Sequence, residues 1–383
     1  MKCFYYLLLS CLLYSCAASS PDPVLKALRQ EILKRAERNL SEKPVTVTSF
    51  IAERSMGGTH DFFSEGDYWW PDSLNLDGPY VRRDGESNPD NFIAHRHAMI
   101  RFSTITGNLT SAYLITQDKK YAEAVMQHIR AWLVNKETKM NPNLLYAQAI
   151  KGIATGRGIG IIDTVHLVEV AQSLLRLQQA GILSPEDIKA TREWFASYLN
   201  WMVTHPYGMD EMKAKNNHGT CWVMQAAMFA KYVGDKEMMQ FCSDRYKEVL
   251  LPGQMAEDGS FPLELARTKP YVYSLFNLDA MTMICRILST DKDDLWQYTT
   301  EDGRNIMLGI SYLYPFVADK SKWKLPPDVM CWEEWPVAHP FLLFGSMQLK
   351  DQAMLDTWLG LEHFPTNNEV VRNLPIRNPI IWL

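Results

Sequence analysis

Cysteine is scarce in this sequence, and the spacings typical of metal sites are missing. Seven cysteines occur in 383 residues, with no Cys-x-x-Cys or His-Glu-x-x-His pattern, so neither a metal site nor another cofactor is predicted. Three of the seven lie within the first 16 positions. The others lie in apolar, helix-like contexts without a closely spaced partner, which favours buried free thiols at Cys221, Cys242, Cys285 and Cys331.

Basic residues are not in excess. The sequence contains 39 Lys and Arg against 44 Asp and Glu, with a formal net charge of -5. A nucleic-acid partner is therefore disfavoured. An acidic polymer is compatible with this balance only if basic residues gather locally against the acidic background.

Long apolar runs are missing beyond the first residues, so no later segment is predicted to cross a bilayer. The chain starts with a basic residue, a short apolar stretch over residues 4–13 and a small-residue exit, which predicts a signal peptide over residues 1–15. Residues 13–16, Leu-Tyr-Ser-Cys, resemble the bacterial lipobox. We therefore expect an exported bacterial lipoprotein, periplasmic or at the outer-membrane surface, held to the membrane only by a lipid on Cys16. A soluble secreted protein with a coincidental cysteine is the alternative.

Strand-like alternation is nearly absent, and apolar residues recur at helical spacing almost throughout. Helices are predicted over residues 163–177, 184–202, 218–233, 236–249, 277–288, 304–314 and 351–359. The fold class is therefore all-α, although hydropathy alone does not choose between an open solenoid and a closed ring. Long connections at residues 57–89, 141–160, 207–217 and 258–273 are where site residues are expected.

A polar motif, Lys-Asn-Asn-His-Gly-Thr at residues 215–220, stands directly before an apolar helical run. Asn217 and His218 would bring an amide, an imidazole and free backbone N–H groups together at a helix N-terminus, which suits a carboxylate. Asn216 is expected to contact the same ligand. For an isolated Asn-His pair, a plain helix cap is the better interpretation.

A second loop-like segment favours a carboxylate-binding site over a plain helix cap. Residues 258–274 again precede a helix and carry Arg267, Lys269, Tyr271 and Tyr273. Breaking a uronate linkage by β-elimination requires neutralisation of the carboxylate, a base for the C5 proton and an acid for the departing O4. Arg267 with Asn217 can supply the first, while His218 and Tyr273 can supply the other two.

These two segments together resemble the alginate lyase superfamily, whose catalytic domain is an α/α toroid. The resemblance rests on Asn-Asn-His-Gly-Thr at 216–220 and on the stretch from Leu-Ala-Arg at 265–267 to Tyr-Ser-Leu-Phe-Asn-Leu at 273–278. It extends to Gly-Asp-Tyr-Trp-Trp-Pro at 66–71, Tyr-Val-Arg-Arg-Asp-Gly at 80–85 and Gly-Arg-Gly-Ile-Gly-Ile-Ile-Asp at 156–163. It covers roughly residues 50 to 340.

The resemblance implies an incomplete (α/α) toroid or barrel of helical hairpins, with residues 22–383 as one lyase domain and long loops forming the substrate cleft. It implies a polysaccharide lyase that leaves 4,5-unsaturated ends on a 1,4-linked uronate polymer, with mannuronate-rich alginate as first substrate. Asn217 and Arg267 would neutralise the carboxylate, Tyr273 would protonate the leaving oxygen, and His218 would act as base or orient the substrate. Tyr271 is the alternative proton donor.

The stereochemistry of the uronate decides how the proton work is shared. Where H5 and O4 lie on the same side of the ring, one tyrosine could act as both base and acid. Where they are opposed, His218 could be the base facing Tyr273 as the acid. An unperturbed tyrosine titrates near ~10, so the dual role requires neighbouring cations such as Arg267 to favour the phenolate.

Other aromatic and basic residues are candidates for binding the rest of the polymer. Tyr68, Trp69 and Trp70 in a Gly/Asp/Pro-rich loop are typical of a sugar-stacking platform, with burial in the core as an equal alternative. Further substrate contacts are predicted at Arg82, Arg83, His95, His97, Tyr146, Gln148, Asn216, Lys269 and Tyr271. Arg96 is expected on a solvated surface, and the glycines of residues 156–160 at a tight helix–helix approach.

Three rival functions stay open at this level. A glucuronan lyase would use the same mechanism. An α/α-barrel glycoside hydrolase would need two separated carboxylates flanking the glycosidic bond, and no loop carries a clear signal for them. A non-catalytic glycan-binding lipoprotein would share the lipobox and the aromatic loop, but would not need a base and an acid beside one carboxylate site.

Overall fold

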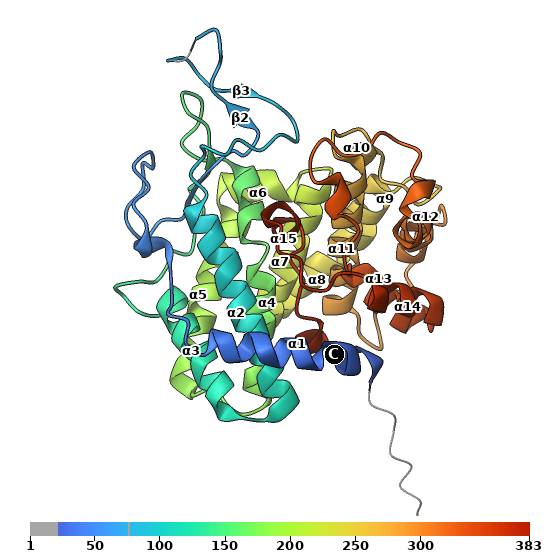
Figure 1. The fold of residues 1–383 in the computed structure, drawn as a ribbon, viewed down its shortest axis with the longest axis horizontal. Helices are drawn as coiled ribbons and strands as arrows, with labels where there is room; N and C mark the ends of the chain where they lie inside the picture. Colours follow the sequence, from blue (N-terminus) through green and yellow to red (C-terminus); the bar gives the residue numbers. More distant parts are fainter. Residues whose placement is uncertain (1–21, 76) are drawn as a thin grey trace, which may run out of the picture.

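Helices that line the interior alternate along the chain with helices that cover them (Figure 1). The computed structural model describes residues 22–75 and 77–383, so the predicted signal peptide and Cys16 lie outside the described residues. Each inner helix lies beside the next one in the series. The inner helices are α2 (Ala94–Thr116), α4 (Leu167–Gln179), α7 (Asn217–Val233), α11 (Pro270–Leu288) and α13 (Pro340–Leu349).

The outer helices pack against this inner layer. They are α3 (Lys119–Leu133), α5 (Pro185–Thr204), α8 (Lys236–Arg245), α12 (Ile306–Ala318) and α14 (Gln352–Gly360). Helix α1 (Pro23–Asn39) packs on α2 and lines a small cavity with α13, so it bridges the two ends of the series. The arrangement is an α/α toroid, which confirms the predicted all-α class.

Short elements occupy the long connections at one end of the toroid. Strand β1 (Phe63–Glu65) pairs in parallel with β4 (Tyr146–Ala149), and β2 (Trp69–Trp70) pairs antiparallel with β3 (Val81–Arg82) in a hairpin that projects from the helices (Figure 1). The other short segments are η1 (Val47–Ser49), η2 (Gly158–Thr164), α6 (Pro206–Met212), η3 (Tyr246–Leu250), α9 (Leu251–Gln254), α10 (Pro262–Leu265), η4 (Lys320–Lys322), η5 (Trp332–Glu334), α15 (Asn368–Arg372) and η6 (Pro379–Trp382).

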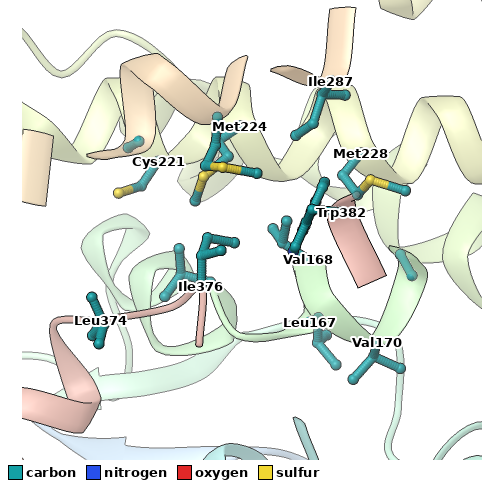
Figure 2. Close-up of a cluster of buried hydrophobic side chains, with 14 of the residues drawn as sticks. Leu167, Val168, Val170, Cys221, Met224, Met228, Ile287, Leu374, Ile376 and Trp382 are labelled. Atoms are coloured by element: carbon teal, nitrogen blue, oxygen red, sulfur yellow. The ribbon is translucent and has the colours of Figure 1, made fainter. Parts of the chain in front are cut away.

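The core lies between the inner helices and is completed by the end of the chain. Helices α7 and α11 are buried on almost every face, as expected for helices that are apolar all round. Figure 2 shows Met224 and Met228 of α7 and Val168 of α4 beside the C-terminal residues Ile376 and Trp382. The C-terminal segment therefore fills the interior of the toroid rather than covering its surface.

Buried polar contacts hold this C-terminal segment in place. The carboxylate of Glu169 on α4 accepts hydrogen bonds from the backbone N–H groups of Arg377 and Asn378, at 2.9 and 2.7 Å, and from the Asn378 side chain at 2.8 Å. Gln172, one turn further along α4, donates to the carbonyl of Ile381 at 2.7 Å. These contacts with α4 fix the C-terminal segment. Helix α15 and Asn373, which precede this segment in the chain, therefore stay at the same end of the toroid as the β2–β3 hairpin.

Several predicted boundaries need correction. The helix predicted from residue 277 begins at Pro270, because the carboxylate of Asp328 caps it through the N–H groups of Tyr271 and Val272 at 2.9 and 3.0 Å. The connection predicted over residues 207–217 contains α6.

The four cysteines predicted to be free are free thiols, with Cys331 only half-buried and the other three buried. Across residues 22–75 and 77–383, no single helix is long and apolar enough to cross a membrane, and only the bent pair of η2 and α4 meets the criterion when its two parts are combined.

Candidate active site

The two helix-opening segments singled out in the sequence meet at one cleft. The cleft has a volume of about 390 Å³ and lies between the β1–β2 loop, η2, the first turns of α7 and α11, and α15. The predicted residues that line it are Tyr68, Trp69, Arg82, Gln148, Asn216, Asn217, His218, Arg267 and Tyr273. The structure therefore brings all four residues predicted to be catalytic to the same cavity.

Tyr273 stands in the first turn of α11, with its hydroxyl 2.5 Å from the hydroxyl of Tyr68. The guanidinium of Arg267 lies over its ring, 4.5 Å from the centroid. Burial raises the pKa of Tyr273 well above its ordinary value, the neighbouring Tyr68 adds to this, and the charge of Arg267 only partly offsets it. The phenol is thus neutral at neutral pH and is suited to donate a proton.

His218 in the first turn of α7 is paired with a buried carboxylate from α6. Its Nδ1 lies 2.6 Å from Glu211 Oε1. Burial alone would lower the pKa of His218, but the charge and hydrogen bond of Glu211 outweigh it and raise this pKa. The imidazole therefore faces the cleft with more positive charge at neutral pH than an isolated histidine would have.

Asn217 is fixed by a second buried carboxylate. Glu264 on α10 accepts from the Asn217 backbone N–H at 2.6 Å and from its side-chain Nδ2 at 2.7 Å. The protein's own carboxylate thus caps α7, which corrects the expectation that the first N–H group of this helix is free for a substrate anion. What Asn217 offers the cleft is the second proton of its amide and its carbonyl oxygen.

Arg267 follows α10 and is held in a planar, two-pronged contact. Its Nε and Nη2 donate to Asp84 at 3.1 and 2.9 Å. Burial alone would raise the pKa of Asp84, but the contact with Arg267 holds this pKa at about 2. Both side chains are therefore ionised at neutral pH. Among the described residues, the remaining nitrogen of Arg267, Nη1, has no hydrogen-bond partner and is the one placed to meet an incoming carboxylate.

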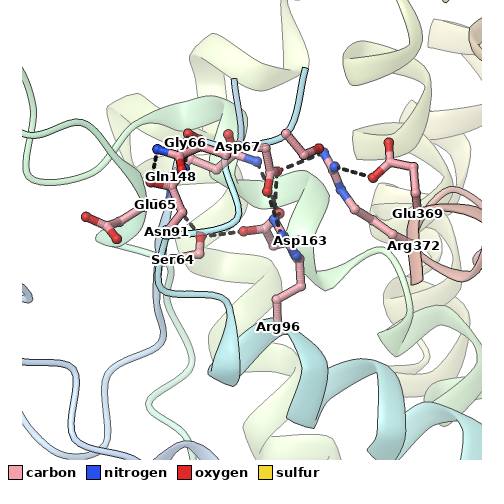
Figure 3. A network of polar contacts seen from close by, with 12 residues as sticks. Ser64, Glu65, Gly66, Asp67, Asn91, Arg96, Gln148, Asp163, Glu369 and Arg372 are labelled. Carbon is pink, nitrogen blue, oxygen red and sulfur yellow. Dashed lines mark hydrogen bonds and ion pairs between the residues drawn. The ribbon is translucent and has the colours of Figure 1, made fainter. Parts of the chain in front are cut away.

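A buried ionic network supports the floor of the cleft (Figure 3). The carboxylate of Asp67 accepts hydrogen bonds from Arg96 at 2.6 and 2.7 Å and forms an ion pair with Arg372 of α15 at 2.9 Å. Arg372 also forms an ion pair with Glu369 at 3.0 Å. Burial disfavours the charge on Asp67, but Arg372 and Arg96 hold its pKa at about 2. The prediction of a solvated surface for Arg96 is therefore wrong, because its guanidinium is buried and donates through both Nη atoms to Asp67.

Arg157 is the cleft arginine without an acidic partner. Its Nε and Nη2 donate to the backbone and side-chain oxygens of Gln148 at 2.8 and 3.3 Å, and it makes no ion pair with a described carboxylate. Burial therefore lowers the pKa of Arg157 to about 10. An added Cβ on Gly156 would come within 1.9 Å of the carbonyl oxygen of Leu145, just before β4, and one on Gly158 within 2.6 Å of the carbonyl oxygen of Tyr207 on helix α6. The tight approach predicted for these glycines is therefore to helix α6 at Gly158 and to the start of β4 at Gly156.

We expect Arg157→Met to weaken polymer binding, because this guanidinium has no internal carboxylate to satisfy it. A charge-assisted hydrogen bond contributes roughly 1.5–3 kcal/mol, so KM for a uronate polymer should rise by roughly tenfold to 100-fold, with kcat changed far less. Steady-state kinetics measure this. Arg83→Met is the control, since Arg83 stacks on Trp70 at 4.9 Å outside the cleft, and an equal change in both variants would contradict a specific role for Arg157.

Two predicted histidines are not at the cleft. His95 is buried among Phe50, Phe62 and Phe92, and its Nδ1 accepts the backbone N–H of Phe63 at 3.0 Å. Burial lowers its pKa to about 4, so it is a neutral structural residue rather than a substrate contact. His97, two positions along α2, is exposed but does not line the cleft.

Three more predicted contacts belong to other parts of the surface. Trp70 donates from its indole to the carbonyl of Glu86 at 2.9 Å and is stacked by Arg83 on the hairpin. Tyr146 lies on β4 and packs its ring over Gly57. None of Trp70, Arg83 and Tyr146 lines the cleft, whereas Tyr68 and Trp69 of the predicted platform do.

Lys269 and Tyr271 are buried behind the cleft. The Nζ of Lys269 pairs with Glu369 at 2.6 Å and lies 5.1 Å from the ring centroid of Tyr273. The hydroxyl of Tyr271 donates to the carbonyl of Phe316 at 3.0 Å. Both predictions of direct substrate contact are corrected, and Tyr271 is not placed to be the alternative proton donor.

The sequence analysis missed the residues that support and extend the site. Among the cleft residues it did not identify Asp67, Arg157, Arg372 and Asn373, and behind them the two carboxylates Glu211 and Glu264. Arg157 stood inside a quoted motif, and an arginine flanked by glycines was its only local signal. No group of three or more His, Cys, Asp or Glu side chains placed to hold a metal occurs in the described part of the chain.

Comparison with known proteins agrees with this geometry. The alginate lyase family profile matches residues 46–323, and the chain belongs to this family. A crystal structure of an alginate lyase from Bacteroides ovatus is 30% identical with a TM-score of 0.82, covering 94% of both chains. Alginate lyase A1-III from Sphingomonas species A1 is 17% identical with a TM-score of 0.56, covering 92% of this chain and 94% of that one.

A histidine-to-alanine variant of alginate lyase A1-III, complexed with a tetrasaccharide, is 16% identical with a TM-score of 0.60, covering 94% of both chains. No protein with a curated description matches the sequence significantly. The fold, the family and the converging side chains together make this protein a polysaccharide lyase of the alginate lyase type.

Proposed function

We propose that the protein cleaves alginate by β-elimination, with mannuronate-rich chains as its preferred substrate and 4,5-unsaturated uronates as products. The observation that carries this proposal is the composition of the cleft. A neutral phenol, an imidazole and an amide share it with four arginines, while Asp67 is the single carboxylate among the residues that line it. This is the local basic surface that an acidic polymer requires on a protein of negative net charge.

The proposed reaction starts with the uronate carboxylate between Asn217 and Arg267. Their hydrogen bonds stabilise the negative charge that develops when the C5 proton leaves. The electron pair of the broken C5–H bond forms the C4=C5 double bond, and the C4–O4 bond breaks. Tyr273 protonates the departing O4, a role that its neutral phenol supports.

The base depends on the sugar. In mannuronate, H5 and O4 lie on the same side of the ring, so we propose that the oxygen of Tyr273 also accepts the C5 proton. This requires the phenolate, which burial opposes and the charges of Arg267 and Arg372 favour. In guluronate the two groups are opposed, and the neutral form of the His218 imidazole is the base that faces Tyr273 across the cleft. The dual use of one tyrosine is the reason for preferring mannuronate.

Four polymers test this proposal directly: polymannuronate, polyguluronate, glucuronan and polygalacturonate. Double-bond formation is followed by ultraviolet absorbance, with sizing of the products. The highest rate is expected on polymannuronate, and a higher rate on glucuronan would assign the enzyme to that polymer instead. New reducing ends without absorbance would identify a hydrolase, and binding without any product would identify a glycan-binding protein.

We also propose that the protein is an exported lipoprotein attached through Cys16. The support is the sequence pattern of residues 1–16. In a bacterial host, Cys16→Ala should move the protein from the membrane fraction to the soluble fraction, while Cys331→Ser should not. Equal fractionation of both variants would contradict the lipid anchor.

A further inference from the structure

The protein contains two histidine–carboxylate pairs of nearly the same geometry. His218 Nδ1 lies 2.6 Å from Glu211, and His339 Nδ1 lies 2.7 Å from Asp279. Both carboxylates are only 1% exposed. The imidazoles differ, because His218 is 20% exposed and lines the cleft while His339 is 1% exposed and sealed in the core.

The contact with Glu211 determines which nitrogen of His218 carries the proton. An ionised carboxylate only accepts hydrogen bonds, so the proton between the two groups stays on Nδ1. Nε2 is then the nitrogen left to titrate, and it is the one available to the cleft. If the neutral ring carried its proton on Nε2 instead, the imidazole would present a donor where the base of the proposed reaction must accept a proton.

Glu211 has little other structural use in its surroundings. It sits on α6, a helix of seven residues inside a connection, and its second carboxylate oxygen, Oε2, has no hydrogen-bond partner among the described residues. A buried carboxylate with one free oxygen is costly unless a cation faces it. The imidazolium of His218 is the cation in contact.

We infer that Glu211 is a positioning residue of the lyase, which acts through His218 by fixing the proton on Nδ1 and directing Nε2 to the substrate. This inference rests on the proposed function. The other charged groups that face the imidazole are Glu264 from α10 and Arg267 from the segment after it. Glu264 is already engaged by Asn217, and Arg267 by Asp84, so Glu211 is the group that bonds the ring.

Loss of the negative charge should change the ionisation of His218 in a defined direction. In the wild-type protein Glu211 raises the pKa of His218 against the opposing effect of burial. In Glu211→Gln burial is no longer outweighed, so this pKa should fall. The imidazolium of His218 then loses its proton at a lower pH. The amide of Gln can also donate a hydrogen bond to Nδ1, which favours the neutral tautomer with the proton on Nε2.

The experiment combines four variants with two measurements. Nuclear magnetic resonance of 15N-labelled histidine follows the tautomer and titration of His218, assigned by its loss in His218→Ala. Steady-state kinetics on polymannuronate and polyguluronate give kcat, KM and their pH profiles for Glu211→Gln, His218→Ala, the double variant and Asp279→Asn. The last is the matched control, since it breaks the sealed pair without touching the cleft.

On polyguluronate, where His218 is the proposed base, Glu211→Gln should lower kcat/KM by roughly tenfold or more, mainly through kcat, and shift the pH profile to lower pH together with the His218 titration. In the double variant it should cause no further loss beyond His218→Ala. Asp279→Asn should lower the melting temperature and leave the pH profile unchanged.

An unchanged tautomer and titration in Glu211→Gln, or full additivity in the double variant, would overturn the inference. Should the wild-type protein cleave no uronate polymer, the proposed function fails, while the resonance titration still decides whether Glu211 controls the imidazole.

Discussion

Replacing Tyr273 by phenylalanine is expected to reduce turnover by roughly 10²- to 10⁴-fold, the range typical for loss of a general acid or base. The reason is that O4 would lose the proposed proton donor and would leave as an unprotonated alkoxide. Binding of an oligosaccharide should remain measurable, because the ring and its stacking partner Arg267 stay in place. Single-turnover kinetics and titration calorimetry separate the two effects.

Tyr271→Phe is the control for this prediction. It removes a hydroxyl two positions earlier in the same helix, but one that donates to Phe316 away from the cleft. Its turnover should stay near the wild-type value even if its melting temperature falls. A Tyr273→Phe variant with near-normal turnover would remove the phenol from the mechanism, and the partner hydroxyl of Tyr68, 2.5 Å away, would then be tested next.

Replacing Arg267 by methionine is expected to lower kcat/KM by roughly 10²- to 10³-fold, the loss typical for a donor that stabilises developing charge. The substrate carboxylate would lose its guanidinium partner, and Asp84 would be left with Arg82 as its ion-pair partner at the rim of the cleft. Arg267→Lys should recover only part of the loss, because an ammonium cannot bridge Asp84 and a substrate carboxylate with a planar fork.

Arg101→Met serves as the control for Arg267. Arg101 also pairs with a carboxylate, that of Glu42, but on the surface near α1. Surface pairs of this kind contribute little, so activity and stability should change little. If Arg267→Met were as active as this control, carboxylate neutralisation would have to come from other cleft arginines.

The positions of the proposed catalytic residues could be predicted from the sequence because Asn217, His218 and Tyr273 lie in the first turn of a helix and Arg267 lies shortly before one, each within a polar motif. Asn217 and His218 open α7 as predicted, and Gly234 with φ 88° ends it. Tyr273 was predicted in a loop but lies in the first turn of α11, since a carboxylate distant in sequence, Asp328, caps that helix. The prediction was therefore wrong about where α11 begins, but Tyr273 still lines the cleft.

The residues that surround this centre could not be predicted, because they arrive from distant segments. Arg372 reaches the cleft since the C-terminal segment is buried inside the toroid, which no periodicity reveals. His95 and Arg96 follow one another in a basic stretch, yet both are buried, His95 against Phe63 of β1 and Arg96 against Asp67 of the β1–β2 loop. Local charge did not distinguish a buried ion pair from a substrate contact.

The central claim is that this cleft breaks its polymer by elimination, and the origin of the oxygen in the products tests it most directly. Digestion of polymannuronate in water labelled with heavy oxygen, followed by mass spectrometry, separates elimination from hydrolysis. We expect unsaturated products that carry no label beyond the amount that a reducing end takes up by exchange with water. Saturated products that carry one labelled oxygen per cleaved bond would contradict this claim.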